Sequence, residues 1–201
     1  MLKLEITNPE ACGRMGIIAF RRAFDVAVRE YKIGDIDGTV KLTFKPFRLQ
    51  ELMVSHTKKG INVQTAGVSG ETYSRVLPGN VSLVRIMPAP SMSMQDVMQT
   101  WLHEMKHVAQ HLKGEFVANE DDDHITWMGS IMTDVQVRKI GYDNFPWEKD
   151  AREAAEKLIP VVMQDLDDYA QTPEGKRQFK LARVELLGEL LRGAGVYEGH
   201  A

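Results

Sequence analysis

The sequence predicts an α+β fold in which a small sheet packs against helices. Apolar residues recur at helical spacing over 17–31 and again over 97–112, whereas residues 39–46 alternate apolar and polar with a period of two. Glycines divide the rest of 38–88 into short runs that suit further strands. We therefore expect a small mixed sheet packed against an N-terminal helix and a second helix, with additional C-terminal helices.

Length and composition favour one folded domain. The chain has 201 residues, of which 43% are hydrophobic and 26% charged, so it can bury a substantial core. We expect a single domain over 1–201, with a core at about 10–170 and a helical extension at about 171–201. A net charge of −3 and the lack of any Lys/Arg-rich block argue against a nucleic-acid partner.

The compartment is predicted from cysteine use and from hydropathy. Cys12 is the only cysteine, so the chain has no internal disulfide. Residues 1–6 are too short and too charged for a signal peptide, and no window approaches about 18 apolar residues. We expect no membrane association and a cytoplasmic location, although a protein carried in a particle would have the same composition.

The first helix and the strands follow from local signals. Asn8-Pro9-Glu10 can open a helix, and Gly34 ends it. The inward stripe of this helix comprises Ile17, Ile18, Phe20, Phe24, Val28 and Tyr31. The strand candidates are about 39–46, 61–66, 71–77 and 80–87.

The second helix is predicted from Ser93, a suitable N-cap with Asp96 three residues later, to about Lys113. Its core-facing residues are Val97, Trp101, Met105, Val108 and Leu112, while Thr100, His103, Glu104, His107 and His111 lie on another side.

The C-terminal half is predicted to be mostly helical. The acidic run 120–123 suits a solvated loop, and an extended piece follows at 125–132. Pro146 starts a helix that Pro160 bends or ends. A last helix covers about 173–192, with Phe179, Val184, Leu187 and Leu191 inward.

The second helix contains the motif H-E-x-x-H at residues 103–107. His103 and His107 are four residues apart and share one helix face, so each can offer an imidazole nitrogen to a single Zn²⁺. Glu104 is then placed to take a proton from a water molecule on the metal. The alternative is a pair of solvated histidines on an ordinary helix surface.

A catalytic zinc site usually has three protein ligands, so a third must come from elsewhere. The extended motif H-E-x-x-H-x-x-G-x-x-H is excluded, because Gln110 and Lys113 occupy its Gly and third His. His103 and His111 lie about 12 Å apart at a rise of 1.5 Å per residue, too far to bind one ion. We place His111 beside the site or on the surface. The next candidates are the carboxylates of 146–153.

The segments HEMKHVAQHLKGE, ITWMGS and YDNFPWEKDA together resemble zincin-like metallopeptidases of the gluzincin type. The resemblance covers about 80–155 and looks closest to small metallopeptidases of tailed bacteriophages and bacteria, whose second motif reads P-W-E-x-E-A. It implies a minimal zincin-like domain and Glu148 as the third ligand, in a Glu-x-x-Ala pattern with Ala151. Arg152 stands where many gluzincins have Asp, and Asp150 replaces the second Glu, so Asp150 stays a rival ligand. Without a metal, both carboxylates would simply favour a helix N-terminus.

Two further side chains near the motifs could donate a hydrogen bond to a developing oxyanion, namely Tyr142 and His124. Asp121, Asp122 and Asp123 lack the spacing of a calcium loop.

Two classes of function follow. The first is a zinc peptidase, most simply an endopeptidase, which acts on protein or peptide substrates and uses Zn²⁺ as its one cofactor. The alternative is a non-catalytic structural or binding protein that retains the fold, as a phage-particle component would. Glu104 favours the first, because a purely structural site needs no general base. The resemblance places such a protein in the host cytoplasm or the virion.

Overall fold

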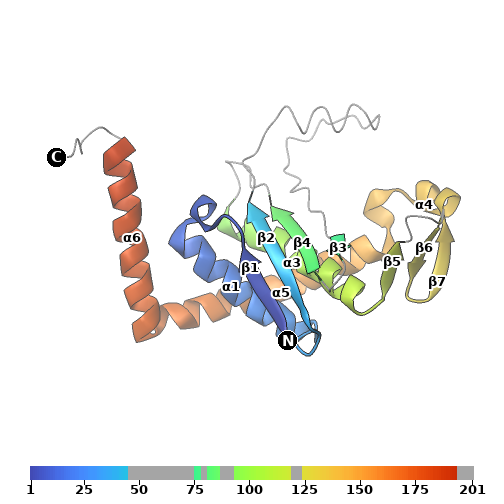
Figure 1. The fold of residues 1–201 in the computed structure, drawn as a ribbon, viewed down its shortest axis with the longest axis horizontal. Helices are drawn as coiled ribbons and strands as arrows, with labels where there is room; N and C mark the ends of the chain where they lie inside the picture. Colours follow the sequence, from blue (N-terminus) through green and yellow to red (C-terminus); the bar gives the residue numbers. More distant parts are fainter. Residues whose placement is uncertain (45–74, 78–80, 87–92, 119–123, 194–201) are drawn as a thin grey trace.

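The computed structural model describes residues 1–44, 75–77, 81–86, 93–118 and 124–193. Its architecture is α+β, as the sequence predicts, with a four-stranded sheet, a three-stranded sheet and several helices. The strand candidate at 61–66 and the acidic run 120–123 lie outside the described residues. The three-stranded sheet lies at one end of the molecule and the last helix, α6, at the other (Figure 1).

The four-stranded sheet has the order β1-β2-β4-β3. β1 (Leu2–Ile6), β2 (Gly38–Phe44) and β4 (Val81–Ile86) run parallel, and β3 (Arg75–Leu77) pairs antiparallel with β4. The parallel connection from β1 to β2 passes through η1 (Pro9–Ala11) and helix α1 (Gly13–Glu30). β1 was not among the predicted strands: its Lys3 and Glu5 alternate with apolar residues, but the segment is only five residues long.

The period-two pattern of the strands places the core on one sheet face. Val40, Leu42 and Phe44 of β2 are buried, and their register partners on β4 are Ser82, Val84 and Ile86, which are buried too. Helices α1, α3 and α5 lie behind the strands in Figure 1 and contribute the other half of the core. The predicted stripe of α1 is confirmed for Phe20, Phe24 and Tyr31, which are buried, and for Val28, which packs against the core. Ile17 and Ile18, at its start, are only partly buried.

Helix α3 (Met94–Leu112) carries the H-E-x-x-H motif and is the best-predicted element. Its N-terminus is the expected Ser93–Asp96 capping box, with the Asp96 N–H donating to Ser93 Oγ at 3.2 Å. At its C-terminus Gly114 has φ +68°, and the N–H of Glu115 reaches back to the Gln110 carbonyl at 2.8 Å. The predicted core residues are buried or packed against the core.

The three-stranded antiparallel sheet comprises β5 (Phe116–Ala118), β6 (His124–Trp127) and β7 (Ser130–Thr133). β6 and β7 replace the single extended piece predicted at 125–132, because Met128 and Gly129 both take positive φ and close a two-residue hairpin. Helix α4 (Asp134–Ile140) and η2 (Tyr142–Asn144) follow. α4 was not predicted, although Thr133 and Gln136 form a capping box at its start.

Helix α5 (Pro146–Gln171) begins at Pro146, as predicted. Pro160 does not end it, since the helix continues for eleven residues beyond this position. The Pro160 ring lies on the exposed side of α5, while Leu158, Ile159 and Val162 hold the opposite side of this segment in the core.

Helix α6 (Pro173–Gly193) contacts α1 and α5 and otherwise stands apart from the sheet (Figure 1). The prediction that Val184 and Leu187 face inward is wrong: they are 60% and 52% exposed. The helix attaches instead through polar contacts, in which Arg14 donates to Glu185 and to Gln178. Phe179 lies near the Tyr169 ring, and the side chain of Leu191 lies outside the described residues. Within the described ranges, no helix combines the length and the apolar character needed to cross a membrane.

The packing of α3 supports a stability prediction. Trp101 is fully buried, with its ring edge-on to Phe20 at 5.8 Å. Trp101→Ala should lower the free energy of unfolding by about 3–5 kcal/mol, because it leaves a cavity between α1 and α3. The control Leu187→Ala should change it by less than about 0.5 kcal/mol. Urea denaturation measures both; equal effects would contradict this assignment of the core.

Candidate metal centre

Three side chains from two helices converge on one point. His103 and His107 lie one turn apart on α3, and their Nε2 atoms are 3.0 Å apart. Glu148, in the first turn of α5, places Oε2 3.3 Å from His103 Nε2 and Oε1 3.4 Å from His107 Nε2. The described residues contain no other group of three His, Cys, Asp or Glu side chains with ligating atoms this close.

The separations suit a zinc ion. Bonds of about 2.0–2.1 Å in a tetrahedral site place two donor atoms about 3.3–3.4 Å apart. The two His–Glu separations match this value, and the His–His separation is slightly smaller. Two imidazoles and one carboxylate are also the donor set of several catalytic zinc sites. The residues therefore fit the metal that the motif predicts, although protonated histidines paired with Glu148 would give a similar cluster.

Glu104 lies beside the three ligating groups. It is only 6% exposed, and its Oε1 lies 3.9 Å from His103 Nε2. Glu104 lies within the helix turn between His103 and His107, so its carboxylate reaches the same site. A carboxylate at this position can exchange a proton with a water molecule between it and the ligand atoms.

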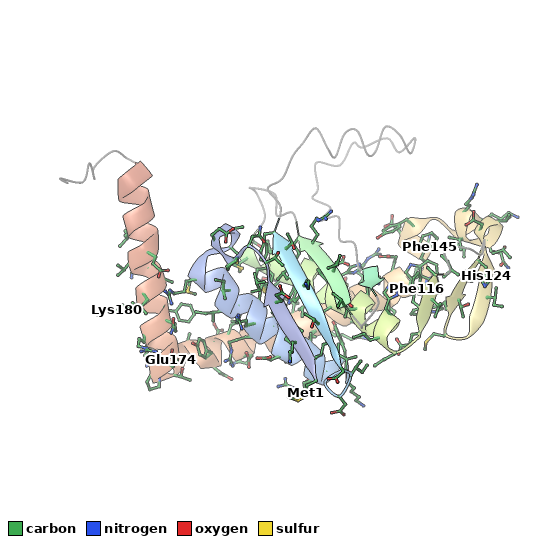
Figure 2. All side chains as sticks on the ribbon, viewed as in Figure 1. Met1, Phe116, His124, Phe145, Glu174 and Lys180 are labelled. Carbon is green, nitrogen blue, oxygen red and sulfur yellow. The ribbon has the colours of Figure 1, made fainter. Side chains whose placement is uncertain are left out.

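The first turn of α5 is held in place by aromatic side chains. The Trp147 ring lies 4.7 Å from Phe145, 5.0 Å from Phe116 and 6.2 Å from Trp127. Phe116 and Trp127 are register partners on β5 and β6, so the three-stranded sheet packs against the residue next to Glu148. Figure 2 shows Phe116 and Phe145 where this sheet meets the rest of the molecule. The hairpin at Met128-Gly129 therefore contributes to the position of Glu148.

Behind His107 lies a buried polar network. His107 Nδ1 is 2.8 Å from Gln110 Oε1, and Gln110 Nε2 donates to the Trp147 carbonyl at 3.0 Å and to Asp150 Oδ2 at 2.9 Å. Lys106 Nζ lies 3.0 Å from the same Asp150 oxygen. The sequence interpretation considered Gln110 only as a departure from the extended motif. Its place one turn after His107, on the same helix face, was the signal that could have identified it.

The remaining candidates take different positions. Asp150 joins the network behind His107 and is not one of the three converging groups, so its prediction as a rival ligand is not supported. His111 also lies outside the cluster, with its ring edge-on to Phe116 at 4.9 Å. His124 is on β6, opposite Thr133, and is not part of the cluster (Figure 2). Arg152, which replaces the expected Asp, lies 3.5 Å from Asp143.

Tyr142 is the one predicted oxyanion donor that the structure brings to the cluster. Desolvation raises the pKa of its hydroxyl, and the negative charge of Glu148 and a hydrogen bond to it raise this pKa further. The residue as a whole is 64% exposed, so its ring borders solvent while its hydroxyl faces Glu148. A hydroxyl that stays protonated can act as a hydrogen-bond donor at the edge of the site.

The electrostatics of the cluster reflect its mixture of charges. Burial opposes ionisation of Glu148, but hydrogen bonds from His103 and His107 outweigh it and lower the carboxyl pKa to about 2. Burial disfavours the charged form of His107, yet its hydrogen bond to Glu148 and the charge of Glu104 raise its pKa overall. Burial lowers the pKa of His111 to about 4, so this imidazole is neutral at pH 7. Glu148 is therefore ionised at pH 7, as a carboxylate that binds a cation has to be.

Comparisons of the chain with protein-family models, curated proteins and solved structures found no match. The interpretation of the site therefore depends on its own residues and geometry.

The geometry predicts zinc-linked stability. Zinc at about 100 times its Kd should stabilise the protein by about 2.7 kcal/mol, and a chelator should reverse the rise in Tm. Glu148→Gln should abolish stoichiometric zinc uptake, because the amide is a poor replacement for the carboxylate ligand. The matched control Glu153→Gln, on an exposed position of the same helix, should bind zinc as the wild type does.

Elemental analysis and thermal denaturation with and without zinc measure these outcomes. Unchanged zinc stoichiometry in Glu148→Gln would remove Glu148 from the ligand set.

Proposed function

We propose that this protein is a zinc-dependent metallopeptidase of the zincin type that hydrolyses peptide bonds. The observation that carries the proposal is a buried carboxylate, Glu104, beside a convergent His103–His107–Glu148 donor set. A structural zinc site is normally closed by four protein ligands, whereas a catalytic site has three and keeps one position open. The donor set found among the described residues has three members.

The residues divide the chemistry as follows. His103, His107 and Glu148 would hold the ion, which supplies Lewis acidity that acidifies water and polarises a carbonyl. Glu104 accepts a proton from the attacking water while the water oxygen forms a bond to the carbonyl carbon. Glu104 then delivers this proton to the amine nitrogen as the C–N bond breaks. Tyr142 donates a hydrogen bond to the carbonyl oxygen while negative charge develops on it.

The non-catalytic alternative has less support. A structural or binding protein could keep two histidines and Glu148 as an ion cluster, and that role requires no further carboxylate beside them. Glu104 is only 6% exposed and lies 3.9 Å from His103 Nε2, a position that suits proton transfer.

The pairing of the four-stranded sheet limits where an extended peptide substrate could add to β4. Over Val81–Leu83 this strand, β4, already has β2 on one side and β3 on the other, so that part of it offers no free edge.

Replacing the general base tests the proposal. The zinc-loaded wild type should cleave peptides in a tryptic digest of a bacterial lysate, with new termini detected by mass spectrometry. Glu104→Gln should retain zinc and lose at least about 10²-fold in rate, because the amide cannot accept the proton. Glu153→Gln is again the matched control. Undiminished cleavage by Glu104→Gln would exclude its role, and a zinc-bound but inactive wild type would favour the non-catalytic alternative.

Removing the Tyr142 hydroxyl tests the oxyanion role separately. Tyr142→Phe should lower kcat by about 10²-fold with little change in KM, because the lost hydrogen bond strengthens only as charge develops. Zinc content should stay the same. The control Tyr169→Phe alters a tyrosine near Phe179, on a distant part of α5. An unchanged kcat in Tyr142→Phe would assign this residue a packing role only.

A further inference from the structure

We infer that Gln110 is a positioning residue that holds His107 in its metal-binding tautomer, with Asp150 and Lys106 fixing Gln110 in turn. The inference rests on the proposed zinc site and assigns this site a supporting network that the motif does not contain. Its evidence is the set of hydrogen bonds behind His107, the burial of Gln110 and the chemistry of each donor and acceptor.

The orientation of the Gln110 amide is determined by its neighbours. The group that faces both the Trp147 carbonyl and Asp150 Oδ2 must be the NH₂, because a carbonyl oxygen can only accept hydrogen bonds. The reversed amide would place its oxygen about 3 Å from two acceptors. Gln110 Oε1 is therefore the atom that faces His107.

The orientation of the amide in turn determines the His107 tautomer. Gln110 Oε1 can only accept, so the hydrogen bond of 2.8 Å requires that His107 Nδ1 carries a proton. In a neutral imidazole the other nitrogen, Nε2, then has its lone pair free. Nε2 is the atom that points to His103 and Glu148, so the tautomer selected by Gln110 is the one that can bind a metal.

Burial makes this selection strong. Gln110 is fully buried, and a buried amide that lacks a partner costs about 1–3 kcal/mol. Every polar hydrogen and the oxygen of Gln110 have a partner in the observed arrangement. The opposite tautomer would turn an Nε2–H toward Glu148 but would leave the buried Oε1 of Gln110 facing an unprotonated nitrogen, so the hydrogen bond to Gln110 would become a repulsion.

Asp150 and Lys106 extend the network to the surface of α5. Asp150 Oδ2 accepts from Gln110 Nε2 and lies 3.0 Å from Lys106 Nζ, which balances the carboxylate charge. The Lys106 ammonium also lies 5.8 Å from the centre of the Tyr31 ring, and the Tyr31 hydroxyl donates to the Leu102 carbonyl. Asp150 is therefore a support for Gln110, which explains why a carboxylate so near Glu148 stays outside the donor set.

The decisive variant is Gln110→Met, which preserves side-chain length and helix propensity but removes all three hydrogen bonds. In the metal-free protein, at a pH where imidazole is neutral, ¹⁵N NMR should show His107 protonated on Nδ1 in the wild type. The variant should shift population to the Nε2-protonated tautomer, and its Kd for zinc should rise about 10–100-fold. Val108→Ala is the control: this buried neighbour should lower stability but leave the tautomer and the Kd unchanged.

A folded Gln110→Met with an unchanged tautomer and Kd would overturn the inference. If this variant does not fold, Asp150→Ala provides the test, because it removes one support and should change both quantities in the same direction by a smaller factor; no change would again overturn it. If the wild type binds no zinc, the proposed function fails, while the tautomer measurement still decides the role of Gln110.

Discussion

Helix α3 must satisfy two different neighbours at once, and this constraint organises the molecule. Trp101, Met105 and Val108 enter the core shared with α1 and the sheet, while the adjacent faces present His103 and His107 to α5. A period of 3.6 residues separates these roles without a kink or a change of helix type. Because Trp101 anchors one side by packing, the histidines on the other side can keep one geometry in an otherwise polar setting.

The second half of the site depends on a structure that contributes nothing to the four-stranded sheet. Glu148 reaches the histidines because Trp147 packs among Phe116, Trp127 and Phe145. The small sheet β5-β6-β7 is thus best understood as the support for the start of α5. The four-stranded sheet with α1 and α3 thus forms the platform, while β5–β7 and Phe145–Trp147 determine the position of Glu148.

Helical periodicity and capping signals were sufficient to predict α3, its capping box, its core side and the start of α5. Residues 103–107 predicted two metal ligands and a base, and the family resemblance implied Glu148 as a third ligand; the structure brings these four side chains together, while their roles remain proposals. The prediction failed where long-range contacts decide. β1 depends on pairing with β2, which no local pattern predicts. The exposed face of α6 has the same apolar spacing as a helix face in the core. The role of Gln110 depends on its hydrogen bonds to Trp147 and Asp150, which are 37 and 40 residues away.

The strongest argument for function is the free-energy cost of burying polar side chains around His103 and His107. Glu104, Glu148 and Gln110 are buried polar groups where apolar side chains of similar volume would pack at least as well. Without a cation, the charge of Glu148 favours a proton on His107, whose pKa the hydrogen bond to Glu148 and the charge of Glu104 raise in spite of burial. Gln110 adds to that tendency, because accepting a hydrogen bond from Nδ1 also raises the His107 pKa, and it leaves Nε2 as the group that faces Glu148. An ion pair with Glu148 and a bound cation both use Nε2, but only a cation requires this nitrogen to give up its proton, and the hydrogen bond from Nδ1 to Gln110 stays intact when it does.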